Sequence, residues 1–312
     1  MIAAQRIEAA AATLGEGMQI RRAMPTVHRR TIGAWCFLDH FGPASVAATR
    51  GMRVGPHPHI GLQTVTWLLR GEVLHRDSLG SLQRIEPGAL NLMTAGRGIS
   101  HSEESPQPHS PEIHGIQFWV ALPESARRGP PAFQHYAKVP LVRRAGVSIT
   151  VLAGELCGER SPAQIYTPMV GANIAAPAGA KSVLPLREDF EYGIVVTHGE
   201  VAVTPAPDYG PPGQAPAGVQ RLEPGTLLYL GPGRSELPIA AGSGDAGIVL
   251  VGGEPFGEPM LMWWNFVART KDELTQASRD WNQAAEYLGE VRGYDGPRLV
   301  APMPPWAADR GP

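Results

Sequence analysis

Two short motifs in the first half of the chain each place metal-ligand residue types one residue apart. His57 and His59 stand in PHPH, and His101 and Glu103 stand in SHSE. Alternate residues of a β-strand point to the same face, so each motif on a strand would aim both side chains at one spot. Two such strands facing each other would supply three imidazole nitrogens and one carboxylate oxygen.

Three nitrogens and one oxygen suit iron, manganese, nickel or copper, with about two positions of an octahedron left open for water or substrate. A structural zinc site would more often be closed and contain cysteine. The interior of an eight-stranded barrel is wide enough for one small ligand or ion. The spacing therefore predicts a divalent metal site. The alternative is that the four residues are ordinary polar side chains on strand faces.

Two further polar pairs lie on strand-like segments. Gln117 and Trp119 alternate with apolar residues in HGIQFWVAL, so one of the two sets should face the interior. If Gln117 faces inward, its amide could hydrogen-bond a metal-bound water; an outward-facing Gln117 is the alternative. His75 and Asp77, in LHRDS, are expected to form a structural hydrogen bond at a strand end.

The elements that would position these motifs are mainly strands. Among 312 residues there are 37 glycines and 31 prolines, and 43% of the chain is hydrophobic. Short apolar runs separated by Gly, Pro, Asp and Ser recur along the chain, as is typical of an all-β barrel or sandwich. Two of these runs, TWLLRGEV and GIVVTHGEV, predict hairpins that turn at their Gly-Glu pairs.

One helix is predicted near the end of the chain. Thr270 is a good N-cap, and Glu273 completes a capping box. Apolar residues follow at helical spacing and predict a stripe that packs on the β-structure. The stripe consists of Leu274, Ala277, Trp281, Ala284 and Leu288.

An internal repeat divides the chain in two. EPGALNLMTAGR begins at Glu86 and EPGTLLYLGPGR begins at Glu223, and each follows one of the two predicted hairpins. We therefore predict two β-domains of one type, over residues 1–140 and 141–290, with the helix closing the second. Residues 291–312 form a proline-rich tail that should run extended. Residues 204–220 are expected to form a mobile surface loop.

The repeat also serves as a control for the metal site. Placing Glu86 on Glu223 carries His101 onto Pro238 and Glu103 onto Ala240. Placing Gly71 on Gly199 carries the PHPH motif onto residues 185–187, where His57 meets Pro185 and His59 meets Arg187. The second copy keeps the scaffold signals without the ligands. This argues that the histidines serve function, and it predicts one metal per chain, in the first domain.

Charge, cysteine content and hydropathy limit the partners and the cellular compartment that the sequence suggests. The chain has 27 basic and 29 acidic residues, a balance that argues against direct nucleic-acid binding. Cys36 and Cys157 are far apart in sequence and form no disulfide framework. The N-terminus lacks an apolar signal core, and no stretch approaches the ~18 apolar residues of a membrane span. We expect a cytoplasmic protein without membrane contact.

Three segments closely resemble the pirin family of the cupin superfamily. They are PHPHIGLQTVTWLLRGEVLHRDSLGS, PGALNLMTAGRGISHSE and HGIQFWVALP, and the resemblance continues through GGEPFGEP before the final helix. It implies an all-β bicupin: two tandem antiparallel cupin β-barrels with a short C-terminal helix. It also implies one iron at the positions of His57, His59, His101 and Glu103. Fe(II) is thus the expected metal, with Mn, Ni, Cu or Zn as alternatives.

The chain departs from the family pattern at two places. Pirins commonly read H-x-G-F-E-T, whereas this chain has Gln63 at the carboxylate position. An amide is a weak ligand and no base, so Gln63, like Gln117, is assigned only a role beside the ligands or in the pocket. Pirins often have Gln-Trp where this chain has Asn91 and Leu92, which alters a strand face and the shape of the pocket.

The resemblance implies two kinds of function. Several pirin relatives resemble quercetin 2,3-dioxygenases, which implies that a flavonol-like small molecule and O₂ are the partners. Glu103 would then be both a ligand and the base for the flavonol 3-hydroxyl. The alternatives are a metal- or redox-sensing regulator that binds a protein partner without turnover, and a cupin acting on another small molecule. We expect a monomer, because tandem barrels already form the pair that single-barrel cupins make by dimerising.

Overall fold

The computed structural model describes residues 4–205 and 218–307. Internal contacts divide the chain into two compact units that interleave along the sequence. Unit 1 comprises Met1–Ala11, Arg21–His40 and Lys138–Phe256, and unit 2 comprises Ala12–Ile20, Phe41–Ala137 and Gly257–Pro312. The domain ranges 1–140, 141–290 and 291–312 stay a prediction, and the loop predicted over 204–220 lies mostly outside the described residues.

Unit 2 contains two main sheets. The larger has the strand order β12-β9-β6-β11-β4-β3-β2, and parts of β2, β3 and β4 belong to segments of unit 1. Its strands are β2 (Ala10–Leu14), β3 (Met18–Met24), β4 (Trp35–Ser45), β6 (Leu62–Arg70), β9 (Leu90–Thr94), β11 (Glu112–Ala121) and β12 (Ala132–Tyr136). The smaller sheet has the order β5-β10-β7-β8. Its strands are β5 (Arg53–His59), β7 (Val73–Asp77), β8 (Leu82–Ile85) and β10 (Ile99–Glu104).

Unit 1 repeats this strand order and adds one short strand, β15. Its larger sheet has the order β1-β21-β18-β23-β16-β14-β13, with β15 on β14, and its smaller sheet has the order β17-β22-β19-β20. The larger sheet contains β1 (Gln5–Glu8), β13 (Leu141–Arg144), β14 (Val147–Leu156), β15 (Glu159–Arg160), β16 (Met169–Ala176), β18 (Glu191–His198), β21 (Thr226–Leu230) and β23 (Ala246–Gly253). The smaller contains β17 (Lys181–Pro185), β19 (Val201–Val203), β20 (Gln220–Leu222) and β22 (Glu236–Ala241).

The repeated EPG motif forms the same turn in both units. In Glu86–Ala89 and in Glu223–Thr226, the last backbone N–H donates to the first carbonyl at 3.1 Å. Gly88 (φ 92°) and Gly225 (φ 98°) occupy the third position, where a type II turn needs the positive φ that glycine adopts freely. The sequence repeat is therefore a repeat of turn chemistry.

The predicted hairpins at the Gly-Glu pairs are wrong, although the strands on either side exist. β6 pairs with β9 and β11, whereas β7 pairs with β8 and β10, so the two strands belong to different sheets. Gly71 (φ 79°), and likewise Gly199 (φ 72°) in unit 1, carries the chain from the larger sheet to the smaller one.

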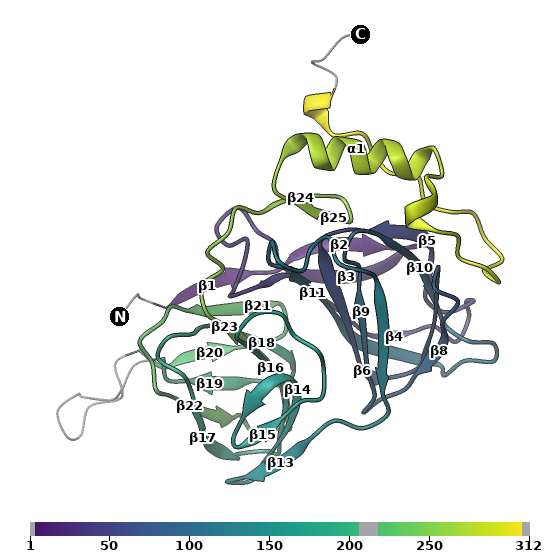
Figure 1. Ribbon diagram of the computed structural model, residues 1–312. Helices are drawn as coiled ribbons and strands as arrows, with labels where there is room; N and C mark the ends of the chain where they lie inside the picture. Colours follow the sequence, from purple (N-terminus) through teal and green to yellow (C-terminus); the bar gives the residue numbers. More distant parts are fainter. Residues whose placement is uncertain (1–3, 206–217, 308–312) are drawn as a thin grey trace, which may run out of the picture. The chain divides into compact units, whose positions relative to one another are not determined.

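The predicted capping box at the helix is confirmed. The Thr270 side chain accepts from the Glu273 backbone, and the Glu273 side chain accepts from the Thr270 backbone, at the start of α1 (Lys271–Asn282). The helix ends before the apolar period does, because Ala284 has a positive φ of 56°. Figure 1 shows α1 lying over β24 (Leu261–Trp263) and β25 (Phe266–Ala268). Two short 3-10 turns, Glu286–Leu288 and Pro305–Ala307, follow.

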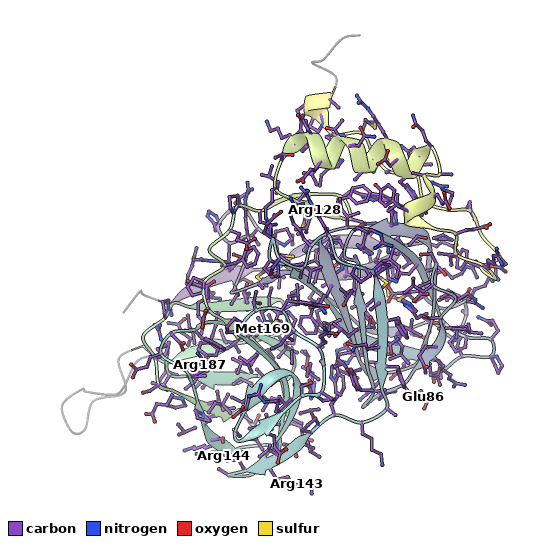
Figure 2. All side chains as sticks on the ribbon, in the orientation of Figure 1. Glu86, Arg128, Arg143, Arg144, Met169 and Arg187 are labelled. Carbon is purple, nitrogen blue, oxygen red and sulfur yellow. The ribbon has the colours of Figure 1, made fainter. Side chains whose placement is uncertain are left out.

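Apolar side chains fill the space between the two sheets of unit 1 and part of that space in unit 2. In unit 1 a single buried cluster joins residues of both sheets, among them Leu184, Ile194 and Leu237. Figure 2 shows the exposed Arg143 and Arg144 directed outward from β13. The all-β fold with two cupin domains and one short helix is confirmed; in each, two facing sheets form the cupin without closing into a continuous barrel.

Candidate metal centre

The PHPH motif forms the last four residues of β5, an edge strand of the smaller sheet. An edge strand tolerates proline because one of its sides needs no ladder hydrogen bonds. Alternation then sends His57 and His59 to one face and the prolines to the other. β10 pairs with β5 so that His101 lies directly opposite His57. The structure thus brings the three predicted histidines together.

The three histidines form one buried cluster. His59 is 1% exposed and His101 also 1%, and their Nε2 atoms lie 3.0 Å apart. The ring centroid of His57 lies 4.4 Å from that of His101 and 5.1 Å from that of His59. One nitrogen from each ring can be chosen so that all three lie within 4.8 Å of one another.

Backbone carbonyls determine which nitrogen of two rings carries the proton. His57 Nδ1 lies 2.8 Å from the Gly55 carbonyl oxygen, and His59 Nδ1 lies 3.0 Å from that of Asn265. A carbonyl only accepts, so both Nδ1 atoms donate, and a neutral ring keeps its lone pair on Nε2. Burial keeps the rings neutral: it lowers the pKa of His57 to about 4 and the pKa values of the other two well below their ordinary range.

His75 and Asp77 extend the cluster from β7, and the predicted hydrogen bond between them is confirmed. Asp77 Oδ2 lies 3.1 Å from His75 Nε2, and His75 Nδ1 lies 3.4 Å from His101 Nδ1. Asp77 accepts from His75 Nε2, and if His75 Nδ1 accepts from His101 Nδ1, the lone pair of His101 lies on Nε2, facing His59.

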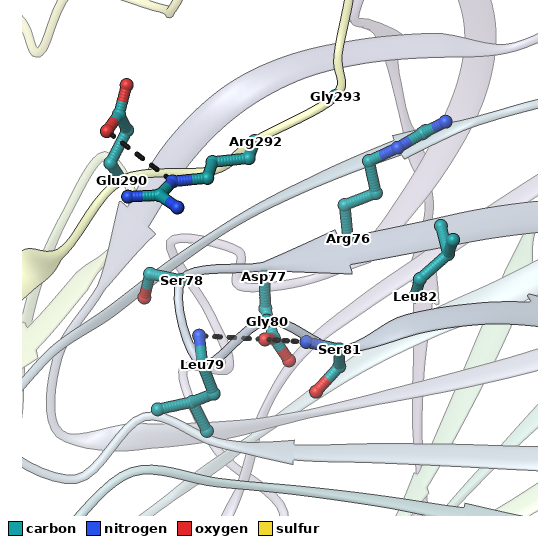
Figure 3. Close-up of a pocket in the computed structure, with 10 residues that line it drawn as sticks. All are labelled: Arg76, Asp77, Ser78, Leu79, Gly80, Ser81, Leu82, Glu290, Arg292 and Gly293. Atoms are coloured by element: carbon teal, nitrogen blue, oxygen red, sulfur yellow. Dashed lines mark hydrogen bonds and ion pairs between the residues drawn. The ribbon is translucent and has the colours of Figure 1, made fainter.

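Asp77 is itself firmly held (Figure 3). Its Oδ1 accepts from the backbone N–H groups of Leu79 and Ser81, both at 2.9 Å, beside a pocket of about 690 Å³. Burial raises the pKa of Asp77, but the hydrogen bonds from His75 and Ser81 outweigh it, so that the pKa is lowered. The carboxylate therefore remains an anion that fixes the His75 ring.

Glu103 lies on the same face of β10 as His101, beside His75. One oxygen of its carboxylate, with one nitrogen each of His75 and His101, forms a second set within 4.8 Å, and His101 is common to both sets. Burial raises the pKa of Glu103, while the Thr66 hydroxyl, 3.3 Å from Oε1, opposes that rise.

Gln117 reaches the same group of residues, whereas Gln63 does not. Gln117 Oε1 lies 2.9 Å from the Thr66 hydroxyl, so Gln117 faces the cluster. The Thr66 hydroxyl has one proton and cannot donate to both the Gln117 amide oxygen and the Glu103 carboxylate. If the Gln117 amide is rotated by half a turn, its NH₂ group can donate to Thr66, and the Thr66 hydroxyl can donate to Glu103. Gln63 stands an odd number of positions from Thr66, on the opposite face of β6, where its amide donates to Thr94 at 2.9 Å.

A buried arginine clamps the strands that carry these residues. Arg53, at the start of β5, is 5% exposed and forms ion pairs with Glu16, Glu104 and Asp295. Glu104 is the last residue of β10, so one guanidinium ties β5 to β10 and to the C-terminal segment. The relative position of the two histidine-bearing strands is thereby fixed by charge as well as by backbone pairing.

The donor set fits a divalent metal. The Nε2 lone pairs of His59 and His101 face each other at 3.0 Å and repel. A cation bound by both nitrogens would remove this repulsion. Nitrogen ligands at ~2.1 Å from a metal and at right angles to each other are about 3.0 Å apart. The fit rests on the three histidines, with Glu103 beside His101 as an oxygen donor.

Several residues that build the centre were not assigned to it by sequence reasoning. The Asn265 carbonyl is a backbone group on a distant turn, and no sequence signal marks it. Thr66 could have been found, because its strand alternates Thr64, Thr66 and Leu68 on one face. His75 was recognised as a partner of Asp77, but its contact with His101 depends on β7 lying beside β10.

Strand pairing corrects the alignment of the two repeats by one residue. Leu237 lies opposite Leu184, as His101 lies opposite His57, so Leu237 rather than Pro238 is the counterpart of His101. The ungapped match at the EPG motif does not extend through the loop that follows it, because the two loops differ in length. The conclusion is unchanged, since these positions of unit 1 contain no ligand.

Two tandem domains of this topology, with a histidine cluster between the sheets of one of them, define a bicupin. Family models give the narrower assignment. The Pirin model matches residues 17–120, and the model of the Pirin C-terminal cupin domain matches residues 171–286. The chain belongs to the pirin family.

Individual relatives agree with this assignment. A Pseudomonas aeruginosa protein named "Putative quercetin 2,3-dioxygenase" is 44% identical over 98% of this chain and 92% of its own length. A "Pirin-like protein" of Caulobacter vibrioides is 35% identical over 88% of this chain and 91% of its own. The crystal structure of quercetin 2,3-dioxygenase from Acinetobacter baumannii is 42% identical, with a TM-score of 0.89 over 97% of this chain and 96% of that one.

Within the described residues, no helix is both long enough and apolar enough to span a membrane.

Proposed function

We propose that this chain is a metal-dependent dioxygenase of the quercetinase type. It holds one divalent metal, Fe(II) foremost, through His57, His59, His101 and Glu103, and opens the ring of a flavonol with O₂. The observation that carries the proposal is the cluster of three neutral imidazoles, two of which are oriented by backbone carbonyls so that Nε2 is free to bind a metal. The names of the two relatives above 40% identity support the substrate class.

A bound metal would supply Lewis acidity and redox chemistry for a flavonol and O₂ at one place. The protein supplies orientation and proton transfer. Glu103 is buried, and its raised pKa suits a base that takes the proton of the flavonol 3-hydroxyl. Thr66 holds the carboxylate by its hydroxyl, and Trp119, edge-on to His59 with ring centroids 5.1 Å apart, forms an apolar wall beside the centre.

The test combines metal content with oxygen uptake. The wild type and His101→Ala are loaded anaerobically with Fe(II), and oxygen uptake is followed with quercetin. We expect one iron per chain and uptake in the wild type, and loss of both in His101→Ala. His198→Ala, an exposed histidine of unit 1, is the matched control and should behave like the wild type.

The outcomes separate the alternatives. Stoichiometric iron without uptake would contradict the dioxygenase and favour a regulator that binds metal without turnover, or another substrate. A wild type that takes up no metal would contradict the assignment of the centre itself.

A further inference from the structure

Four polar side chains form a row across four neighbouring strands of unit 2. Strand pairing places Gln117 on β11 opposite Thr66 on β6, Thr66 opposite Asn91 on β9, and Asn91 opposite His135 on β12. Directly opposed residues share one face of a sheet, with Cβ atoms about 4.5–5.5 Å apart. The row is therefore continuous, and it runs from half-buried Gln117 through two buried residues to half-buried His135.

This polar row lies on the face of the larger sheet that is turned toward the proposed metal centre, whose ligands stand on the smaller sheet. The Thr66 hydroxyl is 3.3 Å from Glu103. The next row on the same face is mainly apolar and consists of Trp119, Thr64, Met93 and Phe133. Its two end members touch the centre: Trp119 lies edge-on to His59, and the Phe133 ring stacks on His75 with centroids 4.3 Å apart.

Asn91 has a hydrogen-bonding capacity that the described residues do not use. It is 3% exposed, and its Oδ1 accepts from His135 Nδ1 at 2.7 Å. Burial lowers the pKa of His135, so the ring is neutral and donates through Nδ1. Asn91 Nδ2 has no hydrogen-bond partner within the described chain. Leaving a buried donor without a partner destabilises the protein, and a pairing oxygen would offset that cost.

The corresponding positions among the described residues of unit 1 are mainly apolar. Strand pairing makes Leu250, Ile194 and Leu228 the counterparts of Gln117, Thr66 and Asn91. All three are buried in the apolar cluster of unit 1, and only the edge counterpart, Arg6 on β1, is polar. The unit that lacks the histidines thus also lacks the polar row, although the strand order is the same. A row needed only for the fold would be present in both.

We infer that the polar row recognises the oxygen atoms of a planar aromatic ligand, with Asn91 Nδ2 donating to one of them. The inference rests on the proposed function and extends it to substrate recognition. The apolar row beside it offers Trp119 and Phe133 to the ring faces, while the polar row meets the carbonyl or hydroxyl oxygens at the ring edge. A flavonol has both features, a flat apolar body and oxygen atoms along its rim.

The test measures binding separately from turnover. Metal-loaded wild type, Asn91→Leu and Asn91→Asp are titrated anaerobically with quercetin by absorbance and fluorescence. Leucine copies the residue at the same position of unit 1, and aspartate keeps the shape but removes the N–H donor. We expect both to weaken quercetin binding by about three- to tenfold, as loss of one hydrogen bond predicts, with metal content unchanged. Asn173→Leu, a half-buried asparagine of β16 in unit 1, should bind like the wild type.

A set of flavonols, each lacking one oxygen, then locates the contact. The penalty of Asn91→Asp should vanish for the analogue without the contacted oxygen and persist for the others. Equal quercetin affinity in the wild type and both Asn91 variants would overturn the inference, as would a wild type that binds no quercetin. A wild type that binds quercetin through Asn91 but takes up no oxygen would overturn the proposed reaction and leave the recognition row standing. Thermal unfolding of each variant confirms that it is folded.

Discussion

The smaller sheets of the two units have the same strand order, yet their inward-facing residues differ in kind. In unit 2 these positions hold His57, His75, His101 and Glu103. Their counterparts in unit 1 are Leu184, Val203, Leu237 and Ile239. All four unit 1 residues are buried in one apolar cluster. The fold therefore forms without the polar residues, which supports the proposal that in unit 2 they serve a metal centre rather than the scaffold.

The difference has an energetic side. Apolar residues facing one another stabilise unit 1 by burial, about 1.5–3 kcal/mol for each large side chain. Neutral histidines at the same places lose much of this gain, because their nitrogens leave water for few partners. Metal binding would restore the loss in unit 2, since a ligand that binds only the folded state stabilises it. Unit 1 should thus be indifferent to metal, and unit 2 should depend on it.

The largest effect is expected from making unit 1 resemble unit 2 at one position. Leu237→His removes a fully buried leucine and places an imidazole in an apolar cluster. We expect the free energy of unfolding to fall by about 3–5 kcal/mol, measured by urea denaturation. The metal content should remain one per chain.

The control for this variant is Leu237→Met, which conserves volume and should cost less than about 1.5 kcal/mol. A Leu237→His protein as stable as the wild type, or one that binds a second metal, would show that unit 1 tolerates a polar centre. The comparison between the units would then say nothing about function.

Acid should distinguish the two units in the metal-free protein. The pKa of His57 in the folded chain, about 4, lies below the ordinary 6.5. The unfolded chain then binds more protons between these values, so the free energy of unfolding falls as the pH falls through this range. His57 alone predicts a loss of about 2 kcal/mol between pH 7 and pH 5.

Hydrogen exchange can assign that loss to one unit. Protection of β5 and β10 should decrease at pH 5 more than protection of β17 and β22, whose inward-facing residues do not titrate. His57→Leu should remove most of the excess. Equal acid sensitivity in both pairs of strands would mean that the buried histidines are not its cause.

The sequence predicted the fold and the clustering of His57, His59 and His101 through features that depend on local spacing. The alternation in PHPH and SHSE needs only the period of a strand, and the EPG repeat needs only the chemistry of one turn. The capping box at Thr270 is likewise a contact over three residues. Each of these signals can be recognised without knowing which strand pairs with the segment that contains it.

Features that depend on strand order could not be predicted in the same way. TWLLRGEV looks like a hairpin, but its strands belong to different sheets, because Gly71 redirects the chain between them. Gln63 stands where a carboxylate is common, yet it lies on the opposite face of β6 from Thr66. The links from Asn265 to His59 and from His75 to His101 join distant segments. They become visible only when the pairing of β7, β10 and the C-terminal hairpin is known.

We expect the smallest effect from changing Asp77, whose carboxylate is hydrogen-bonded to His75 and not to a proposed metal ligand. Asp77 acts through His75, which accepts from His101 and so leaves the lone pair of His101 toward the centre. Asp77→Asn keeps the shape but replaces the anion, and an amide can turn either a donor or an acceptor to His75. The His101 ring would then populate the wrong tautomer part of the time. We expect Fe(II) affinity to fall about tenfold, the lower end of the range for residues that hydrogen-bond to metal-bound histidines. Competition with a chelator measures this affinity.

The control is His75→Val, which copies the residue at the same position of unit 1. It should weaken Fe(II) binding at least as much, and adding Asp77→Asn to it should weaken binding no further. Additive losses in the double variant would mean that Asp77 acts on the centre by charge alone and not through the orientation of His75.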